Sequence, residues 1–364
     1  MTDDQAELTG SAATAHPAAA APVPDTPAGI AEPTGSAPLR GDPLITGASG
    51  TAATTAHPAA AAPAPDTPAG IAVLANPSAG RGRYRGLLPA VLDRLAVGGR
   101  AVRLLAADSS AEAEKVCHRA VAEGVSGLVA VGGDGTVHQA LQAVAGRPVG
   151  FGVVPAGTGN DFAAGTGVPL DPLAAADAIA AAVRDGRHHA VDLARMTGTE
   201  GEVRWFGAVL AAGFDAIVNE RANRMRWPRG PRRYDLAIAL EIARLRPRVY
   251  ALEIDGEDRG FEGVLVAVGN CASYGGGLRI LPGADPTDGL LDVLVAAPFG
   301  RVTLARLKPR LRRGTHVTDR RVTTYRARQV RIHADGIVGY ADGERIGPLP
   351  LEISCVPGAV RLLR

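Results

Sequence analysis

Residues 71–185 alternate between short apolar runs and stretches with helical periodicity. The apolar runs predict strands at 71–76, 101–107, 127–131 and 149–154. The stretches between and after them predict helices at 84–97, 110–123, 136–145, 159–165 and 171–185. In the second of these helices, Ala113, Val116 and Ala120 fall on one face. Short apolar strands separated by amphipathic helices are typical of a parallel sheet that helices cover on both faces.

After about residue 187 the pattern changes to a period of two. Segments such as AVDLARM, RVYALEID, LLDVLVAAP and RQVRIHAD alternate apolar and polar positions or form short apolar runs between Asp-Gly and Gly-rich turns. Three helices are expected as well, at 215–226, 231–245 and 301–312. The fold class predicted is therefore α/β: an N-terminal Rossmann-like α/β domain followed by a mainly antiparallel β-sandwich domain.

The first 69 residues differ from both patterns. Residues 13–31 read ATAHPAAAAPVPDTPAGIA, and 54–72 read TTAHPAAAAPAPDTPAGIA, a copy displaced by 41 positions. Such Ala- and Pro-rich sequence cannot bury enough apolar surface to fold, so 1–69 is expected to be a disordered tail. The domains predicted are 70–186 (α/β) and 187–353 (β-rich), and residues 354–364 are candidates for packing back onto the first.

Charge and composition narrow the class of protein. The 364 residues carry a net charge of +2, but residues 1–70 hold seven acids and one base, which leaves +8 on the remainder. A basic folded part favours anionic partners such as nucleotides or lipid head groups. Three scattered cysteines give no disulfide or zinc pattern, and neither a secretory signal nor an apolar run of about 20 residues is present. A cytoplasmic protein, with peripheral contact at the inner membrane face as an option, is expected.

Three glycine-bearing loops each follow a predicted strand. They are NPSAGRG (76–82), GGDGT (132–136) and PAGTGNDFA (155–163). Ligands of open α/β sheets bind outside the carboxyl ends of the strands, where glycines let backbone N–H groups approach phosphate oxygens. Each loop alone also fits a simple turn, with Thr136 or Asn160–Asp161 capping the next helix. Because all three would meet at one edge, a phosphate site is the favoured interpretation. Neither GxxxxGK[ST] nor GxGxxG after the first strand is present.

Together these loops resemble the diacylglycerol kinase catalytic domain of bacterial lipid kinases, which are related to sphingosine kinases. The motifs are NPSAG, VAVGGDGTVHQA and VPAGTGNDFA, in this order, and the similarity continues in GGGLRILPGADPTDGLLDV (275–293) and YADGE (340–344). The resemblance covers about 70–364. It implies an enzyme that binds ATP between an α/β and a β domain and phosphorylates the primary hydroxyl of a lipid.

The resemblance also implies the residues of the ATP site. They are Asn76, Pro77, Ser78, Ala79, Gly80, Gly132, Gly133, Asp134, Gly135, Thr136, His138, Gly157 and Thr158. The chain departs from the family at two places. The family often has Asn where His138 stands, and Thr where this chain reads Ala106–Ala107, for which Asp108 or Ser109 are candidate substitutes.

Catalytic and metal residues come from the same resemblance. Asp134 is expected to support Mg²⁺ and the phosphates. The general base is expected in Asp342-Gly343-Glu344, with Asp342 the first choice and Glu344 the second. An ordinary hairpin turn is the alternative explanation of these residues. Asp285, Asp288 and the carbonyl of Leu290 correspond to a structural Mg²⁺ site in some relatives. A tight ADPTDG turn with Asp288–Gly289 at its tip is the equally favoured alternative.

The function predicted is an ATP- and Mg²⁺-dependent lipid kinase acting on diacylglycerol or a similar lipid. The alternatives are an enzyme like NAD kinase, which shares GGDGT, and a catalytically silent lipid- or nucleotide-binding protein. Residues 221–248 hold nine arginines, and residues 301–331 hold eleven basic residues. These stretches favour an anionic membrane surface as partner, or are solvated surface in an arginine-rich chain; no nucleic acid partner is expected.

Overall fold

The computed structural model describes residues 70–76, 85–228 and 231–364. The predicted tail, 1–69, and six residues of the first glycine loop, 77–82, lie outside these residues. Within the described part of the chain, no helix is both long and apolar enough to cross a membrane.

The first half of the chain is a parallel sheet with helices on both faces. Its central strands are β1 (Ile71–Ala75), β2 (Val102–Leu105), β3 (Gly127–Gly132) and β4 (Gly150–Pro155), which lie in the order β4-β3-β1-β2. The helical segments are η2 (Arg85–Leu87), α1 (Leu88–Leu95), α2 (Ser110–Ala122), α3 (Asp134–Val144), α4 (Asp161–Gly165) and α5 (Pro172–Arg184). The predicted α/β architecture is confirmed.

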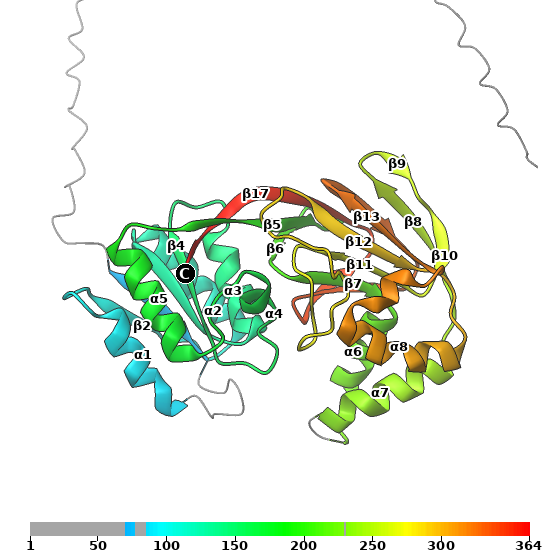
Figure 1. The fold of residues 1–364 in the computed structure, drawn as a ribbon, viewed down its shortest axis with the longest axis horizontal. Coiled ribbons are helices and arrows are strands. Elements are labelled where there is room, and N and C mark those ends of the chain that lie inside the picture. Colours follow the sequence, from blue (N-terminus) through cyan, green and yellow to red (C-terminus); the bar gives the residue numbers. More distant parts are fainter. Residues whose placement is uncertain (1–69, 77–84, 229–230) are drawn as a thin grey trace, which may run out of the picture. The chain divides into compact units, whose positions relative to one another are not determined.

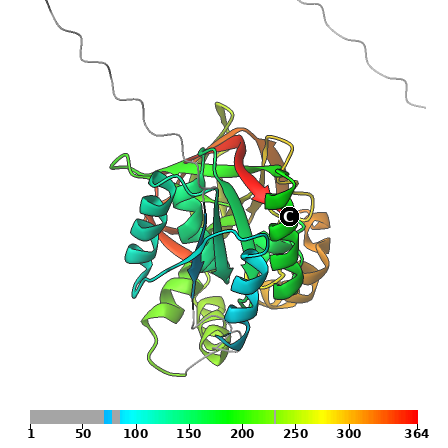
Figure 2. The ribbon, with the colours of Figure 1, turned by 90° about the vertical axis from the view of Figure 1, so that its left-hand side faces the viewer.

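Alternation along β1 explains why both faces of this sheet are covered. Ala72 and Leu74 pack in a core with residues of α2 and α3, whereas Ile71 and Val73 pack on the other face with residues of α1 and α5. All four are at most 3% exposed. In Figure 2 the strands lie between these two pairs of helices. A strand that is apolar at every position has two faces to bury, as the sequence predicted.

The second half holds two antiparallel layers and three helices. One sheet has the order β13-β12-β11-β7-β15-β16. The elements of this half, in chain order, are β5 (His189–Thr197), β6 (Val203–Phe206), β7 (Val209–Gly213), α6 (Phe214–Arg224), α7 (Pro231–Ala243), β8 (Arg248–Ile254), β9 (Glu257–Asp258), β10 (Phe261–Gly263), β11 (Leu265–Gly269), β12 (Leu291–Ala296), α8 (Arg301–Arg313), η3 (Thr315–Thr318), β13 (Val322–Ala327), β14 (Gln329–His333), β15 (Val338–Ala341), β16 (Glu344–Pro348) and β17 (Leu351–Leu363).

A buried cluster joins the two layers face to face. Leu210 and Val266 of one sheet pack with Leu252, Val330 and Ile353 of the other. Each of these side chains is at most 2% exposed. Two sheets that share a dry core in this way form a β-sandwich, so the predicted fold of this half is also confirmed.

Strand β17 links the two halves of the chain. Its first part pairs antiparallel with β14 and its last part, Arg361–Leu363, pairs parallel with β4. Along most of its length it also pairs antiparallel with β5. The parallel strands and one layer of the sandwich therefore belong to a single 11-stranded sheet, and Figure 1 shows β17 (red) passing from one set of strands to the other.

We expect the end of β17 to be essential for the stability of the α/β sheet. Leu362 is fully buried opposite Phe151, so Leu362→Ala should lower the free energy of unfolding by about 2–5 kcal/mol. Leu104→Ala is the matched control, because Leu104 lies on edge strand β2 and is 49% exposed. Its cost should stay within about 0.5 kcal/mol. Denaturant unfolding checks both, and equal losses would show that the β17–β4 contact contributes little.

Candidate functional site

Two of the glycine loops touch through their backbones. Strand β3 ends at Gly132, Gly133 occupies the N-cap position of α3, and the loop after β4 carries Gly157. A Cβ added to Gly133 would lie 3.0 Å from the Cα of Gly157, and a Cβ on Gly157 would collide with the Cα of Gly133. Only residues without side chains allow this approach, which is a stronger requirement than a simple turn would impose.

Asp134 connects the same two loops through its side chain. It is the first residue of α3, so the helix begins two residues before the predicted start and Thr136 lies inside it rather than at its cap. The Asp134 carboxylate accepts hydrogen bonds from the backbone N–H groups of Asn160 (2.8 Å) and Phe162 (3.3 Å). The helix terminus and the loop after β4 are thereby held together.

Asp161 repeats this arrangement towards the β-rich half. Its carboxylate accepts hydrogen bonds from the N–H groups of Gly276 and Gly277, each at 2.9 Å. Both glycines have positive φ, at 80° and 91°, a conformation that glycine adopts without strain. Asp161 is therefore not a helix cap, as the turn interpretation assumed, but a link between the loop after β4 and the Gly275–Gly277 segment.

Asp342 and Glu344 lie at the β15–β16 hairpin and face different surroundings. Asp342 and Gly343 form its tip, with φ of 53° and 85°, which fits a tight hairpin turn. The Asp342 side chain is 4% exposed. Its carboxylate accepts hydrogen bonds from Gly207 N–H (3.1 Å) and Ala208 N–H (2.9 Å), and lies 3.2 Å from Nδ1 of His138. The segment is a hairpin turn that also brings a carboxylate against α3.

A cavity of ≈ 200 Å³ lies between the glycine loops and this hairpin. Its lining residues are Asn76, Ser110, Gly133, Gly135, Thr136, Gln139, Gly157 and Glu344. Six of these belong to the predicted ATP or catalytic residues. Gly132, Asp134, His138, Asp342 and Thr158 are among the predicted residues but not among those that line the cavity, and Pro77, Ser78, Ala79 and Gly80 lie outside the described residues.

Ser110 and Gln139 also line this cavity and were not among the residues predicted from the sequence. Gln139 lies one helical turn after Thr136, a spacing that could have indicated it. Ser110 opens α2, directly after Ser109, whose side chain caps that helix by accepting a hydrogen bond from Glu112 N–H. Ser109, a candidate substitute for the family threonine, therefore has a structural role in this helix.

Burial of several carboxylates shapes the electrostatics of the site. The pKa of Asp134 is raised from 3.8 to about 6, first because the group is buried and then because Asp161 and Asp342 repel its charge; the two N–H groups oppose the rise. The thiol of Cys271 is buried beside the same three carboxylates, and its pKa is raised far above the usual range for the same reasons. A cluster of like charges of this kind is favourable for a cationic ligand.

The predicted structural Mg²⁺ ligands lie apart from this cluster, in the loop before β12. The Asp285 carboxylate accepts hydrogen bonds from N–H (3.0 Å) and the hydroxyl (2.6 Å) of Thr287, and Asp288 accepts from Leu290 N–H (3.0 Å) and is paired with Arg326. No group of three or more His, Cys, Asp or Glu side chains suited to a metal occurs in the described part of the chain. These residues do not fit a cation as they are arranged.

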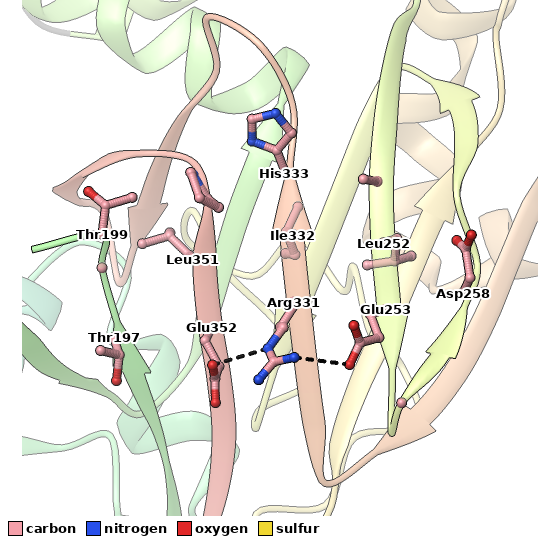
Figure 3. A pocket seen from close by; sticks show the side chains of 14 residues that line it. Thr197, Thr199, Leu252, Glu253, Asp258, Arg331, Ile332, His333, Leu351 and Glu352 are labelled. Carbon is pink, nitrogen blue, oxygen red and sulfur yellow. Dashed lines mark hydrogen bonds and ion pairs between the residues drawn. The ribbon is translucent and has the colours of Figure 1, made fainter. Parts of the chain in front are cut away.

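A larger cavity, of ≈ 580 Å³, lies over strands β5, β17, β14 and β8 (Figure 3). Arg331 lies in it between Glu352 and Glu253, with Nε 3.1 Å from one carboxylate and Nη1 3.4 Å from the other. Asp258 and Thr197 extend the same row across the strands. The cavity contains none of the predicted site residues, so the glycine-lined cavity is the candidate active site.

The raised pKa of Asp134 predicts that the stability of the protein depends on pH. Between about pH 4 and 6 the folded protein binds a proton that the unfolded chain has released, so stability falls as the pH rises through this range. Asp134→Asn should therefore raise the free energy of unfolding by about 1–3 kcal/mol at pH 8, and the gain should vanish near pH 4. Melting at several pH values tests this. Asp335→Asn, at a fully exposed side chain, should show no such dependence, and a loss of stability in Asp134→Asn at pH 8 would contradict the burial argument.

Comparisons with known proteins agree with this geometry. Residues 70–196 match the family model "Diacylglycerol kinase catalytic domain", and residues 208–364 match the "YegS C-terminal NAD kinase beta sandwich-like domain". A diacylglycerol kinase of Mycobacterium tuberculosis is 43% identical over 293 residues, which cover 80% of this chain and 94% of that protein. A protein of Xanthomonas oryzae pv. oryzae named "Probable lipid kinase YegS-like" is 32% identical over 263 residues, 69% of this chain and 82% of that one.

The fold also matches a solved structure. The crystal structure of a diacylglycerol kinase from Bacillus anthracis aligns with a TM-score of 0.60 at 21% identity, and covers 81% of this chain and 96% of that one. At this identity the likeness speaks for the fold. The 43% identical relative spans nearly its whole length, and the resemblance inferred from the motifs is thereby confirmed. The chain belongs to the diacylglycerol kinase family of lipid kinases.

Proposed function

We propose that this protein transfers the γ-phosphate of ATP to the primary hydroxyl of diacylglycerol or a similar lipid in a Mg²⁺-dependent reaction. The observation that carries this proposal is the cavity lined by Gly133, Gly135 and Gly157, which lies at the N-terminus of α3 and is bordered by Glu344. The 43% identical relative is named a diacylglycerol kinase, which supports the choice of acceptor.

The phosphate end of the nucleotide belongs at the start of α3. Four N–H groups at a helix N-terminus have no partner within the helix, and the helix dipole favours negative charge there. Glycine at 133 and 157 brings the two loops together without side chains between them, and both loops line the cavity along with Gly135 and Thr136. These residues bind and orient the phosphates; the chemistry needs little more from the protein than position and charge.

Asp134 and Asp161 are the residues that would hold Mg²⁺ with the nucleotide. Each of their four carboxylate oxygens accepts one backbone N–H, and a carboxylate oxygen can accept two partners, so capacity for a cation or its water remains. Mg²⁺ usually takes one or two carboxylates, waters and substrate phosphates, which this donor set fits. When bound, the ion supplies positive charge that offsets the phosphates and the buried carboxylates.

Asp342 is the proposed general base and Glu344 its neighbour on the phosphate side. As the lipid hydroxyl oxygen bonds to the γ-phosphorus, the bond from that phosphorus to the bridging oxygen of ADP breaks, and the hydroxyl proton moves to Asp342. Oδ2 of Asp342 faces His138 and Gly207, whereas Oδ1 accepts only Ala208 N–H among the described contacts and can still accept a proton. Glu344 instead approaches Gly135, where the phosphates are expected.

An anionic membrane surface is the proposed partner that supplies the lipid. The basic stretches of the sequence fall on α6, α7 and α8 and the residues around them. Trp227 between α6 and α7 is 77% exposed, and Val302 on α8 is 64% exposed. Exposed apolar side chains among arginines suit an interface with anionic lipid, where each nearby basic residue contributes about 1 kcal/mol. In zwitterionic vesicles, or at high salt, binding should weaken.

The direct test of this function is phosphate transfer from labelled ATP. With Mg²⁺, label should enter diacylglycerol offered in anionic vesicles and should not enter NAD. Gly157→Ala should abolish transfer because the new Cβ collides with Gly133, whereas Gly347→Ala, whose Cβ meets nothing within 4 Å, should be active. Label in NAD, or transfer unaffected by Gly157→Ala, would overturn the proposal. Equal binding to anionic and neutral vesicles would refute the proposed membrane partner and would leave the proposed kinase activity unaffected.

Replacing Asp342 separates the catalytic role from the turn. Asn tolerates positive φ, so Asp342→Asn should keep the hairpin but lower kcat by about 10²–10⁴. Asp255→Asn is the matched control: Asp255–Gly256 has φ of 49° and 84°, and its carboxylate also accepts two backbone N–H groups, from Arg328 and Gln329. This variant should leave kcat unchanged and should lower the free energy of unfolding by less than Asp342→Asn does, because Asp255 is exposed. If Asp342→Asn is active and Glu344→Gln is not, the base is Glu344.

A further inference from the structure

Both carboxylates of the loop Asp285–Leu290 are engaged by groups of the protein itself, and Oδ2 of Asp285 is the oxygen without a hydrogen bond among the described contacts. One oxygen of Asp285 is used by the N–H and hydroxyl of Thr287, which closes a local turn. One oxygen of Asp288 accepts Leu290 N–H at 3.0 Å, and the other is bound by the guanidinium of Arg326. The guanidinium of Arg326 therefore supplies, beside Asp288, the positive charge that a divalent ion would otherwise supply.

The register of the sandwich places Arg326 at this position. Strand β13 pairs antiparallel with β12 so that Arg326 lies directly opposite Asp292. Its Nη2 contacts Asp288, and its Nε lies 3.9 Å from Oδ2 of Asp292. A guanidinium is always charged and offers five donors in one plane, so a single arginine can face two carboxylates at once. The side chains of Asp292 and Asp288 are 14% and 24% exposed, and that of Arg326 is 50% exposed.

The loop is also fastened from its other side by Asp192 of β5. Asp192 is 3% exposed, and its carboxylate accepts hydrogen bonds from Gly289 N–H and Gly358 N–H, both at 2.7 Å. Its own N–H donates to the carbonyl of Pro286 at 2.8 Å. The loop is thus held by backbone hydrogen bonds on one side and by the ion pair with Arg326 on the other.

We propose that Arg326 takes the place of a structural divalent cation at this loop, so that the fold of this chain binds no Mg²⁺ there. Removal of the arginine would leave Asp285, Asp288 and Asp292 near one another without a counter-charge. Such a cluster of oxygen ligands, joined by backbone carbonyls, is the chemistry that a hard cation prefers. A chelator should accordingly stop Mg²⁺-dependent turnover without loosening the fold.

Thermal melting without nucleotide tests this inference apart from the kinase activity. The melting temperature of the unaltered protein should be the same in EDTA and in millimolar Mg²⁺ or Ca²⁺. Arg326→Gln should melt lower in EDTA and should regain several degrees when Mg²⁺ or Ca²⁺ is added, because an ion that binds only the folded state stabilises it. Adding Asp288→Asn to Arg326→Gln should abolish that gain.

Arg331→Gln is the matched control. Arg331 lies on β14, the next strand along the chain but in the other sheet, between Glu352 and Glu253, and its neighbours are exposed strand residues rather than a loop. This variant should gain nothing from the ions. Two results would overturn the inference: stabilisation of the unaltered protein by Mg²⁺ that Asp288→Asn removes, or an Arg326→Gln protein that the ions leave unchanged.

Discussion

Carboxylates that accept backbone N–H groups from distant segments hold this protein together. Asp134 binds the loop after β4, Asp161 binds the Gly275–Gly277 segment, and Asp342 binds the turn between β6 and β7. Asp192 does the same between the loop before β12 and β17. A buried carboxylate is costly unless it is hydrogen-bonded, and paired amides meet most of that cost. Each link therefore fixes two segments with little freedom to shift.

The same links explain why the candidate active site is both acidic and ordered. Three of them, at Asp134, Asp161 and Asp342, place their charges close enough for Asp161 and Asp342 to raise the pKa of Asp134. Backbone amides can stabilise these carboxylates but do not cancel the repulsion between them. The site thus has the negative charge that favours a cationic ligand.

The sequence predicted local features well and long-range contacts poorly. Glycine at 133 and 157 could be identified because close backbone approach demands it, and the two faces of β1 follow from its unbroken apolar run. The partners of Asp161 and Asp342 could not be predicted, because they are backbone N–H groups, which every residue except proline carries. The role of Arg326 could not be predicted either, because the chain has 37 arginines and only the register of β13 with β12 shows that this one lies opposite Asp292.

The position of β17 beside β4 also sets an order for the synthesis of the protein. Strands β1 to β4 and their helices emerge early from the ribosome, but the edge of β4 receives its neighbour only when Arg361–Leu363 have been made. Until then that edge presents unpaired N–H and C=O groups to any passing strand. The nascent N-terminal half should therefore need protection by a chaperone or by rapid translation, and a ribosome that stalls within the β-rich half would leave a fragment prone to aggregate.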